Sequence, residues 1–331
     1  MIHVKDLTKA YGARKAIDNI NFSIEEGEVV GFLGPNGAGK TTTMNIMTGF
    51  IAATSGEVTI NGINVTDQPE AAKKNIGYLP DTPPVYLDMR VEEYLNFAAN
   101  IKGVKAKHRK EMVQYVMEQV SIDDIPRRVI KNLSRGYKQR VGLAQAMLGQ
   151  PKVIIMDEPT IGLDPKQIMD MREVVRNLGK KHTVILSSHI MQEVNAVCDR
   201  VMIINKGHIV ASGTPAHLSQ NVSKGANSMR VTVKGAPEDI TPILQSSPII
   251  QTESITLGAE VGTTDLILTG TTDIREAIFN LMSENSRPIY AMTSTELSLE
   301  EIFLKLTNEQ NSEQNQDAIQ DEEDTQDAGD L

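Results

Sequence analysis

The segment GPNGAGKTT, residues 34–42, has the composition and spacing of a phosphate-binding loop, G-x-x-x-x-G-K-[ST]. Small glycines let backbone N–H groups turn toward phosphate oxygens, and the N-terminus of a following helix adds positive partial charge. Lys40 can reach terminal phosphates, and Thr41 can offer its hydroxyl to Mg²⁺. A glycine-rich turn before a helix is the alternative, but this segment also follows an expected strand. The residues that we expect to contact nucleotide are Gly34, Pro35, Asn36, Gly37, Ala38, Gly39, Lys40, Thr41 and Thr42.

Two adjacent acids end a second apolar segment, VIIMDE at 153–158. A carboxylate at the carboxyl end of a parallel strand faces the crevice in which α/β sheets bind ligands. Asp157 is then placed to hold Mg²⁺, and Glu158 to orient or activate a water molecule. Two acids at a solvent-facing turn would give the same pattern in isolation. Their combination with a phosphate loop favours a catalytic site.

Alternating strand and helix patterns surround these residues. Short apolar or alternating stretches predict strands at 2–4, 20–24, 28–33, 57–65, 152–158, 182–189 and 200–207. The segment 57–65 contains Asn61-Gly62, which indicates either a pair of strands or one strand with a turn. Helices are expected from Lys40 to about Thr48 and, from the spacing of apolar residues, within 90–120. Strands that alternate with helices indicate an α/β sheet with covered faces.

The segment NLSRGYKQRVGLAQAML, residues 132–148, resembles the signature of the ATP-binding cassette (ABC) family. The order of the motifs along the chain also matches that family. Tyr11 sits where the family has an aromatic residue that stacks on adenine. GYLPD (77–81) resembles the Q-loop, and IGLDP (161–165) resembles the D-loop. SSH (187–189) resembles the segment that ends in the switch histidine, here His189. The resemblance covers residues 1 to about 220. It implies a P-loop NTPase fold of the ABC ATPase type with a helical insert around 85–140.

Two motifs depart from the common pattern of the family. The usual LSGGQ reads Leu133-Ser134-Arg135-Gly136-Tyr137, and the Q-loop glutamine is replaced by Asp81. Ser134 and Gly136, which in the family touch the terminal phosphate across a dimer interface, are kept. An aspartate at position 81 can still bind Mg²⁺ or a water molecule. Both departures, and SLEEIFLKLT at 298–307, resemble the single-cassette exporter ATPases of the drug-export and gliding-motility type.

The resemblance implies a reaction, a cofactor and partners. ATP and water give ADP and phosphate, with Mg²⁺ as cofactor. Catalysis is assigned to Lys40, Glu158 and His189, and contact with Mg²⁺ to Thr41, Asp157 and Asp81. A second copy or a homologous ATPase subunit closes head to tail over two ATP molecules, and closure moves transmembrane permease subunits on separate chains. Export rather than import follows from the subgroup resemblance alone, and the cargo cannot be read from this chain.

A second region follows a polar stretch near residue 220. Its pattern predicts a strand, helix, strand, strand, helix and strand at 229–233, 237–246, 249–257, 264–269, 273–284 and 288–293, and a short helix at 298–306. This βαββαβ order predicts a small ferredoxin-like α+β domain over 225–306. The tail, 308–331, is acidic and rich in Gln and Asn, a composition typical of disorder.

Charge and cysteine content narrow the class of protein. Of the 43 acidic residues nine lie in the tail, which leaves 34 acids against 33 bases elsewhere. A nearly neutral body argues against nucleic acid as the main partner. A single cysteine, Cys198, fits a reducing compartment, and neither a signal core nor a membrane-length apolar run is present. We therefore expect a cytoplasmic protein held at the inner face of the cell membrane by its partners.

Two other classes fit parts of the pattern. An ABC ATPase that acts on ribosomes or DNA usually carries two cassettes or a long coiled coil, and this chain has one cassette and neither feature. A nucleotide-gated regulatory module with weak turnover would not need Glu158 and His189, which are both intact.

Overall fold

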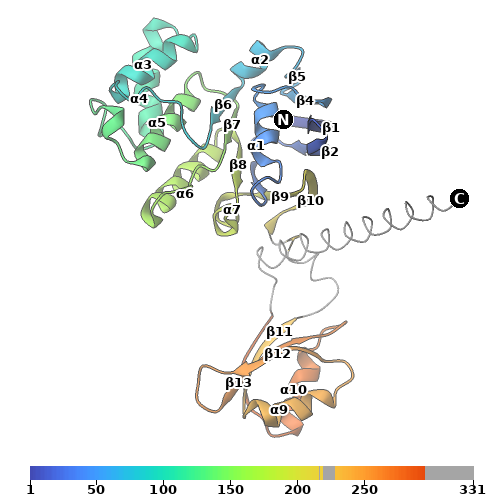
Figure 1. The fold of residues 1–331 in the computed structure, drawn as a ribbon. Helices are drawn as coiled ribbons and strands as arrows, with labels where there is room; N and C mark the ends of the chain where they lie inside the picture. The colour runs from blue at the N-terminus through green and yellow to red at the C-terminus, as the bar shows by residue number, and fades with distance from the viewer. Residues whose placement is uncertain (216, 219–227, 295–331) are drawn as a thin grey trace, which may run out of the picture. The chain divides into compact units, whose positions relative to one another are not determined.

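The computed structural model describes residues 1–215, 217–218 and 228–294. The chain divides into two compact units, Met1–Pro215 and Ala216–Leu331 (Figure 1). The helix expected at 298–306 and the tail from 308 lie outside the described residues.

A six-stranded sheet forms the centre of the first unit, in the order β10-β9-β3-β8-β7-β6. Its strands are β3 Val29–Leu33, β6 Ile76–Leu79, β7 Val153–Met156, β8 Thr183–Ser188, β9 Arg200–Asn205 and β10 His208–Gly213. All neighbours pair in parallel except β10, which is antiparallel to β9. Every residue of β3, β7 and β8 is buried, as expected of parallel strands with both faces covered. The predicted α/β sheet is confirmed.

Different elements cover the two faces of this sheet. Phe32 of β3 lies in a core that also contains apolar residues of α1 (Lys40–Met47). Gly31 faces the other way, and a Cβ there would lie only 2.4 Å from Val194 Cγ1 of α7 (Met191–Val197). Glycine therefore allows α7 to approach the strand closely.

A second sheet, β2-β1-β4-β5, is antiparallel and shares its core with α1. Its strands are β1 Ile2–Tyr11, β2 Arg14–Ile24, β4 Ser55–Ile60 and β5 Ile63–Asn64. The strands predicted at 2–4 and 20–24 were too short. Bulges interrupt the β1–β2 register, and Asp6 has φ 50°, so the apolar alternation breaks although the strand pairing continues. The pair β4–β5 confirms the first of the two alternatives predicted around Asn61-Gly62, a pair of strands.

Most of the chain between β6 and β7 is helical. It contains α3 (Val91–Ile101), α4 (Ala106–Gln119), the 3-10 turn η1 (Ile130–Asn132) and α5 (Arg135–Met147), while the short α2 (Pro69–Lys74) precedes β6. The helices predicted within 90–120 are confirmed as α3 and α4.

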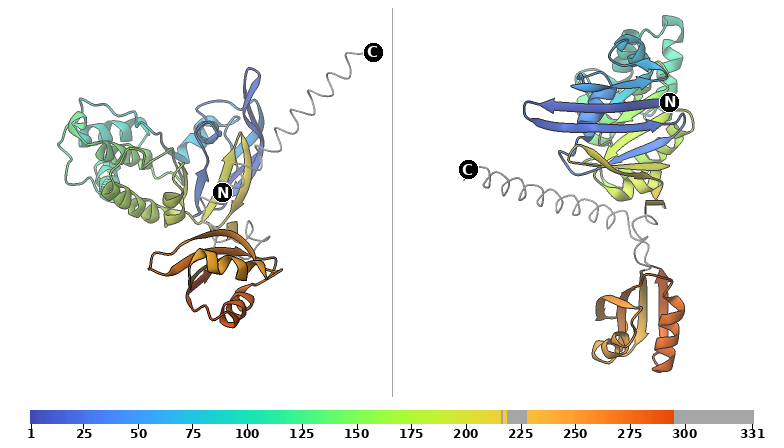
Figure 2. Two further views of the ribbon diagram at one scale, coloured as in Figure 1. Left: turned by 60° about the horizontal axis from the view of Figure 1, so that its bottom comes forward. Right: turned by 90° about the vertical axis from the view of Figure 1, so that its right-hand side faces the viewer.

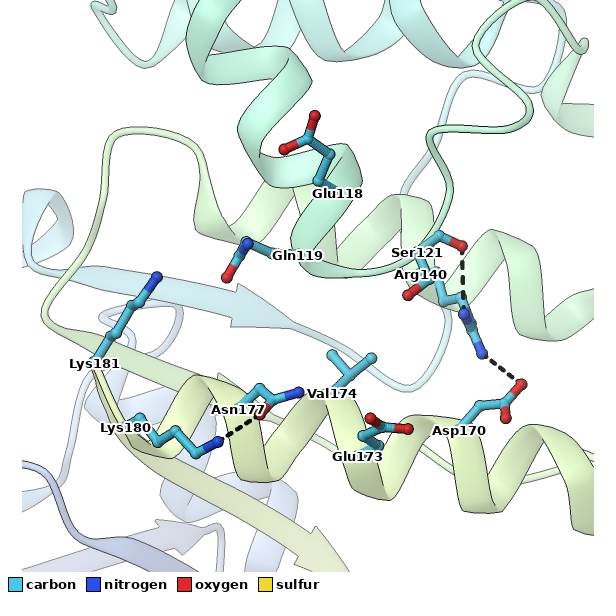
Figure 3. A pocket seen from close by; sticks show the side chains of 10 residues that line it. All are labelled: Glu118, Gln119, Ser121, Arg140, Asp170, Glu173, Val174, Asn177, Lys180 and Lys181. Atoms are coloured by element: carbon cyan, nitrogen blue, oxygen red, sulfur yellow. Dashed lines mark hydrogen bonds and ion pairs between the residues drawn. The ribbon is translucent and has the colours of Figure 1, made fainter.

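Arg140 ties α5 to two neighbouring segments (Figure 3). Its guanidinium donates to the carbonyl of Ser121 at 3.3 Å, just beyond α4. The same group donates to the carbonyl of Val120 at 3.3 Å. It also donates to the carboxylate of Asp170 on α6 (Pro165–Gly179) at 3.0 Å. The pocket around these groups contains none of the site residues expected from the sequence. We therefore regard these contacts as structural support for α5.

The second unit is a four-stranded antiparallel sheet with two helices (Figure 2). Its elements are β11 Met229–Lys234, α9 Pro237–Gln245, β12 Gln251–Leu257, β13 Thr263–Thr269, α10 Arg275–Glu284 and β14 Ile289–Ser294. Apolar residues of the sheet and of both helices form one core, including Val231, Leu266, Ile240 and Ile278. The βαββαβ order and the strand order β12-β13-β11-β14 agree with the predicted ferredoxin-like arrangement.

Within the described ranges, no helix combines the length and the apolar character that are needed to span a lipid bilayer.

Candidate nucleotide site

The loop between β3 and α1 has a backbone that favours glycine. Gly37 has φ 80° and Gly39 has φ 112°, both in the left-handed region. A Cβ on Gly34 would lie 2.3 Å from the carbonyl oxygen of Ile204. Gly39 is the N-cap of α1 and supplies no side-chain cap, which leaves backbone N–H groups of the first turn available to a ligand. The loop therefore has the properties of the predicted anion cradle.

Lys40 places a buried cation beside this cradle. Only 5% of the residue is exposed, and its Nζ donates to the carbonyl oxygens of Gly34 at 2.8 Å and Pro35 at 3.2 Å. The same Nζ lies 3.5 Å from Glu158 Oε1. The ammonium group is thus positioned where terminal phosphates would lie if the loop holds a nucleotide.

Asp157 and Glu158 follow β7 and are held by a serine on the neighbouring strand. Ser187 Oγ donates to Asp157 Oδ1 at 2.5 Å and accepts from the Glu158 backbone N–H at 2.9 Å. Ser187 is fully buried at the end of β8. We did not single out this residue from the sequence, although two serines at the end of an apolar strand were a usable signal.

Glu158 lies between Lys40 and His189. Its Oε2 is 2.9 Å from His189 Nδ1, and its Oε1 is buried without a hydrogen-bond partner in the described part of the chain. The His189 side chain is 40% exposed, whereas that of Glu158 is 12% exposed. The Glu158 backbone has φ 48°, which is unfavourable for a residue with a Cβ. The structure therefore brings together the three residues to which the sequence assigned catalysis.

Tyr78 of β6 adds a neutral hydroxyl near these acids. Burial, and then the negative charge of Asp157, raise the pKa of Tyr78 above its usual range. The hydroxyl consequently stays protonated at neutral pH and donates to Asn45 Oδ1 of α1 at 3.2 Å. This contact links β6 to the helix that follows the phosphate loop.

Similarity to known proteins identifies the family. The family described as "ABC transporter" matches residues 17–161. The bacitracin transport ATP-binding protein BcrA of Bacillus licheniformis is 37% identical over 226 residues, which cover 68% of this chain and 73% of BcrA. This chain belongs to the ABC transporter ATP-binding proteins.

Other ABC proteins extend the similarity. The ABC transporter ATP-binding protein YcbN of Bacillus subtilis (strain 168) is 31% identical over 318 residues, which cover 93% of this chain and 97% of YcbN. A solved structure described as the ATP binding subunit of an ABC transporter is 30% identical with a TM-score of 0.61, and the match covers 67% of this chain and 93% of that one. This chain is accordingly an ATP-binding ABC subunit with an ABC ATPase fold.

The ABC signature residues lie at the start of α5 rather than in the catalytic cluster. Ser134 caps α5 and accepts from the Tyr137 N–H at 3.4 Å. A Cβ on Gly136 would lie 2.5 Å from Gln167 Oε1 of α6. Tyr11 ends β1 with 55% of its surface exposed. None of the contacts described for these three residues reaches the phosphate loop.

Asp81, the substituted Q-loop residue, is bound to α5. Its Oδ1 lies 3.3 Å from Arg135 Nη2, and its carbonyl accepts from Gln139 Nε2 at 2.7 Å. Gln139 is 1% exposed, whereas the Asp81 and Arg135 side chains are about half exposed. The first turns of α5 therefore fix the Q-loop backbone firmly and the Asp81 carboxylate only weakly.

Proposed function

We propose that this ABC subunit hydrolyses Mg-ATP at Lys40, Glu158 and His189 and thereby powers export through separate membrane-spanning subunits. The observation that carries the proposal is the position of the Glu158 carboxylate. It lies 3.5 Å from the cation beside the phosphate loop and 2.9 Å from the His189 imidazole. A water molecule bound to this carboxylate would face a phosphate held by the loop.

The roles of the side chains follow from their contacts. Lys40 can exchange the carbonyls of Gly34 and Pro35 for the more strongly charged oxygens of the terminal phosphates. Glu158 orients the attacking water and accepts its proton. His189 holds the Glu158 carboxylate and stabilises charge on the phosphate as the bond breaks.

The donor set also fits Mg²⁺. No group of three or more His, Cys, Asp or Glu side chains in the described residues could hold a metal ion. A magnesium ion bound by a few protein oxygens and the phosphates needs no such group. Thr41 is exposed in the first turn of α1, and Asp157 is fixed by Ser187. Bound Mg²⁺ would neutralise charge on the phosphates, and Asp81 would contact it through water.

We further propose that two subunits share each site. Ser134 and Gly136 contact only their own helix and α6 among the described contacts, yet Ser134 is exposed. Ser134 is therefore available to a nucleotide on a second copy or a homologous subunit, and we assign Gly136, which is buried against α6, to the same contact. Tyr11, which is also exposed, would stack on adenine.

An aromatic cluster after the Q-loop is the proposed contact with the membrane subunits. Tyr86 packs against Tyr94 and Phe97, with ring centroids 5.9 Å and 5.5 Å apart. Tyr86, Leu87 and Phe97 nevertheless remain 54%, 48% and 39% exposed. Exposed apolar groups of this kind mark interaction sites. Tyr86 and Leu87 follow Asp81 by five and six residues, a position that would connect the nucleotide to the partner.

Direction and location rest on the relatives. BcrA is named for bacitracin transport, and the linearmycin resistance ATP-binding protein LnrL of Bacillus subtilis (strain 168) is 34% identical over 247 residues. Resistance is conferred when a toxic compound leaves the cell, which favours export. The subunit would then act at the cytoplasmic face of the membrane.

Glu158→Gln tests the proposed chemistry in the full-length chain. The variant should bind ATP normally and lose turnover by a factor of about 100 or more, because the amide cannot accept the proton of water. With ATP and Mg²⁺ it should elute as a dimer in light-scattering chromatography, and without Mg²⁺ as a monomer. Normal turnover would contradict the role of Glu158, and a monomer under all conditions would contradict the shared site.

A further inference from the structure

Glu193 of α7 is a buried carboxylate that the chemistry above does not use. The residue is 4% exposed, and it forms no ion pair within the described part of the chain. Its Oε2 accepts from Thr160 Oγ1 in a short hydrogen bond and from Ser188 Oγ at 3.4 Å. Its Oε1 is buried and accepts no hydrogen bond from the described residues. A carboxylate buried with so few partners costs several kcal/mol, by order of magnitude, so its position requires an explanation.

The two donors adjoin the two catalytic residues. Thr160 follows Glu158 by two positions, and Ser188 directly precedes His189. Glu158 and His189 are themselves joined by the 2.9 Å contact between Oε2 and Nδ1. Glu193 therefore closes a ring of covalent and hydrogen bonds that contains both catalytic side chains.

The ring acts on a backbone that needs support. Glu158 has φ 48°, and a strained conformation persists only when its surroundings hold it from more than one side. Ser187 holds the N–H of Glu158 at 2.9 Å. Glu193 holds the chain on the other side, through the hydroxyl of Thr160.

We infer that Glu193 is a positioning residue for ATP hydrolysis, which sets the separation and orientation of Glu158 and His189 through Thr160 and Ser188. The inference rests on the roles proposed above for Glu158 and His189. Loss of the ring should misplace the Glu158 carboxylate relative to the phosphate loop and leave the loop itself intact. The predicted defect is therefore in kcat, with little change in ATP binding.

Thr160→Val is the most direct test in the full-length chain, because valine keeps the shape and removes the hydroxyl that Glu193 binds. Its kcat should fall roughly tenfold, the equivalent of one lost hydrogen bond, while KM and the dissociation constant for ATP stay within about twofold. Thr160→Ser keeps the hydroxyl and should therefore keep most of the wild-type activity. Glu193→Gln can still accept through its amide oxygen and should lie between the two.

Thr183→Val is the matched control, because it makes the same substitution at a buried threonine. Thr183 lies at the end of β8 opposite to Ser188. Thr183 is 2% exposed, and its hydroxyl accepts from the Gly27 N–H at 3.0 Å. This variant should lower the melting temperature and leave kcat unchanged.

The outcomes separate the two proposals. If Thr160→Val and Thr183→Val have equal kcat while Glu158→Gln is inactive, the inference about Glu193 is overturned and the proposed function stands. An increase in KM that matches the whole loss of kcat/KM would also overturn it, because that would be a binding defect. If Glu158→Gln turns over normally, the proposed function fails and the inference fails with it.

Discussion

Lys40 is the side chain on which nucleotide affinity should depend most. Among the described residues, its buried ammonium donates to the carbonyls of Gly34 and Pro35 and lies 3.5 Å from Glu158 Oε1. Replacement by alanine removes the main point charge from the terminal phosphates. We expect Lys40→Ala to weaken ATP binding by about 10- to 100-fold and to abolish turnover. Fluorescence titration with a labelled ATP analogue measures the first effect.

Lys181→Ala provides a matched loss of charge elsewhere. Lys181 Nζ lies 5.4 Å from the Tyr115 ring centroid, and none of the site residues contacts it among the described contacts. Its removal should leave affinity unchanged. Equal losses in both variants would mean that net charge, rather than the phosphate loop, controls binding.

The catalytic residues were predictable where they lie in a continuous motif or at the end of an apolar strand. Lys40 meets the first condition and Glu158 the second, and the structure places them 3.5 Å apart. The serines at the end of β8 were a signal for Ser187, but its partner Asp157 lies 30 residues away and could not be named from the sequence. Glu193 was not predictable, because no local spacing marks it and its partner Thr160 lies 33 residues away. The pairing of β7 with β8 brings Ser187 to Asp157, and α7 brings Glu193 to Thr160.

The start of β3 is held to two other strands by one ion pair. Arg200, the first residue of β9, donates through Nε and Nη2 to the two Glu28 oxygens at 2.6 Å and 2.9 Å. Its Nη2 also donates to the Ser23 carbonyl of β2 at 2.6 Å. Burial raises the pKa of Glu28, but hydrogen bonds from Arg200 and the Glu25 backbone, with the charge of Arg200, outweigh it and lower the pKa.

Glu28→Gln should therefore destabilise the chain in a pH-dependent way. A carboxyl group with a lowered pKa stabilises the folded state above its ordinary value of 4.5, and this contribution disappears as the pH falls through the folded-state pKa. We expect a loss of about 1–2 kcal/mol in the free energy of unfolding at pH 7 and a much smaller loss near pH 3. Urea unfolding of the variant and of the unchanged chain at pH 7 and pH 3 measures this loss of free energy. An equal loss at both would exclude the ionised pair as the cause.

We propose that Asp81 communicates between the nucleotide and the helices between β6 and β7. Its backbone is fixed by Gln139, whereas its carboxylate makes only the exposed contact with Arg135. Asp81→Ala should accordingly impair transport in the assembled complex several-fold more than it impairs ATPase activity of the isolated subunit. Both activities must be measured on the same variant. An isolated subunit as inactive as Glu158→Gln would place Asp81 in the chemistry.

Element types were easier to predict than element lengths. The buried strands β3, β7, β8 and β9 were evident because parallel strands with covered faces are apolar almost throughout. The parallel strand β6 was missed, because it has four residues of which only two are buried. The antiparallel edge strand β10 was missed, since its apolar run, residues 209–211, is short and its residues are only partly buried or exposed. The full lengths of β1 and β2 were missed because bulges interrupt the alternation of apolar and polar residues while the two strands remain paired.

The chain consists of two units with separate cores, and only the first contains the residues assigned to nucleotide. The described part of the second unit has a sheet and two helices but no counterpart of the phosphate loop or of the acid pair after β7. We therefore expect the second unit to dock or regulate rather than to bind ATP.

A chain truncated after Pro215 tests this division, because the first compact unit ends there. Lys40, Glu158 and His189 and the strands that position them are all retained, so the truncated chain should bind ATP within about threefold of the full-length affinity. Titration with labelled ATP, together with circular dichroism to show that the chain is folded, gives the answer. The truncated chain with Lys40→Ala is the control for nonspecific binding. A folded truncated chain that binds ten times more weakly would show that residues beyond 215 contribute to the nucleotide site, and the second unit could then no longer be treated as an independent module.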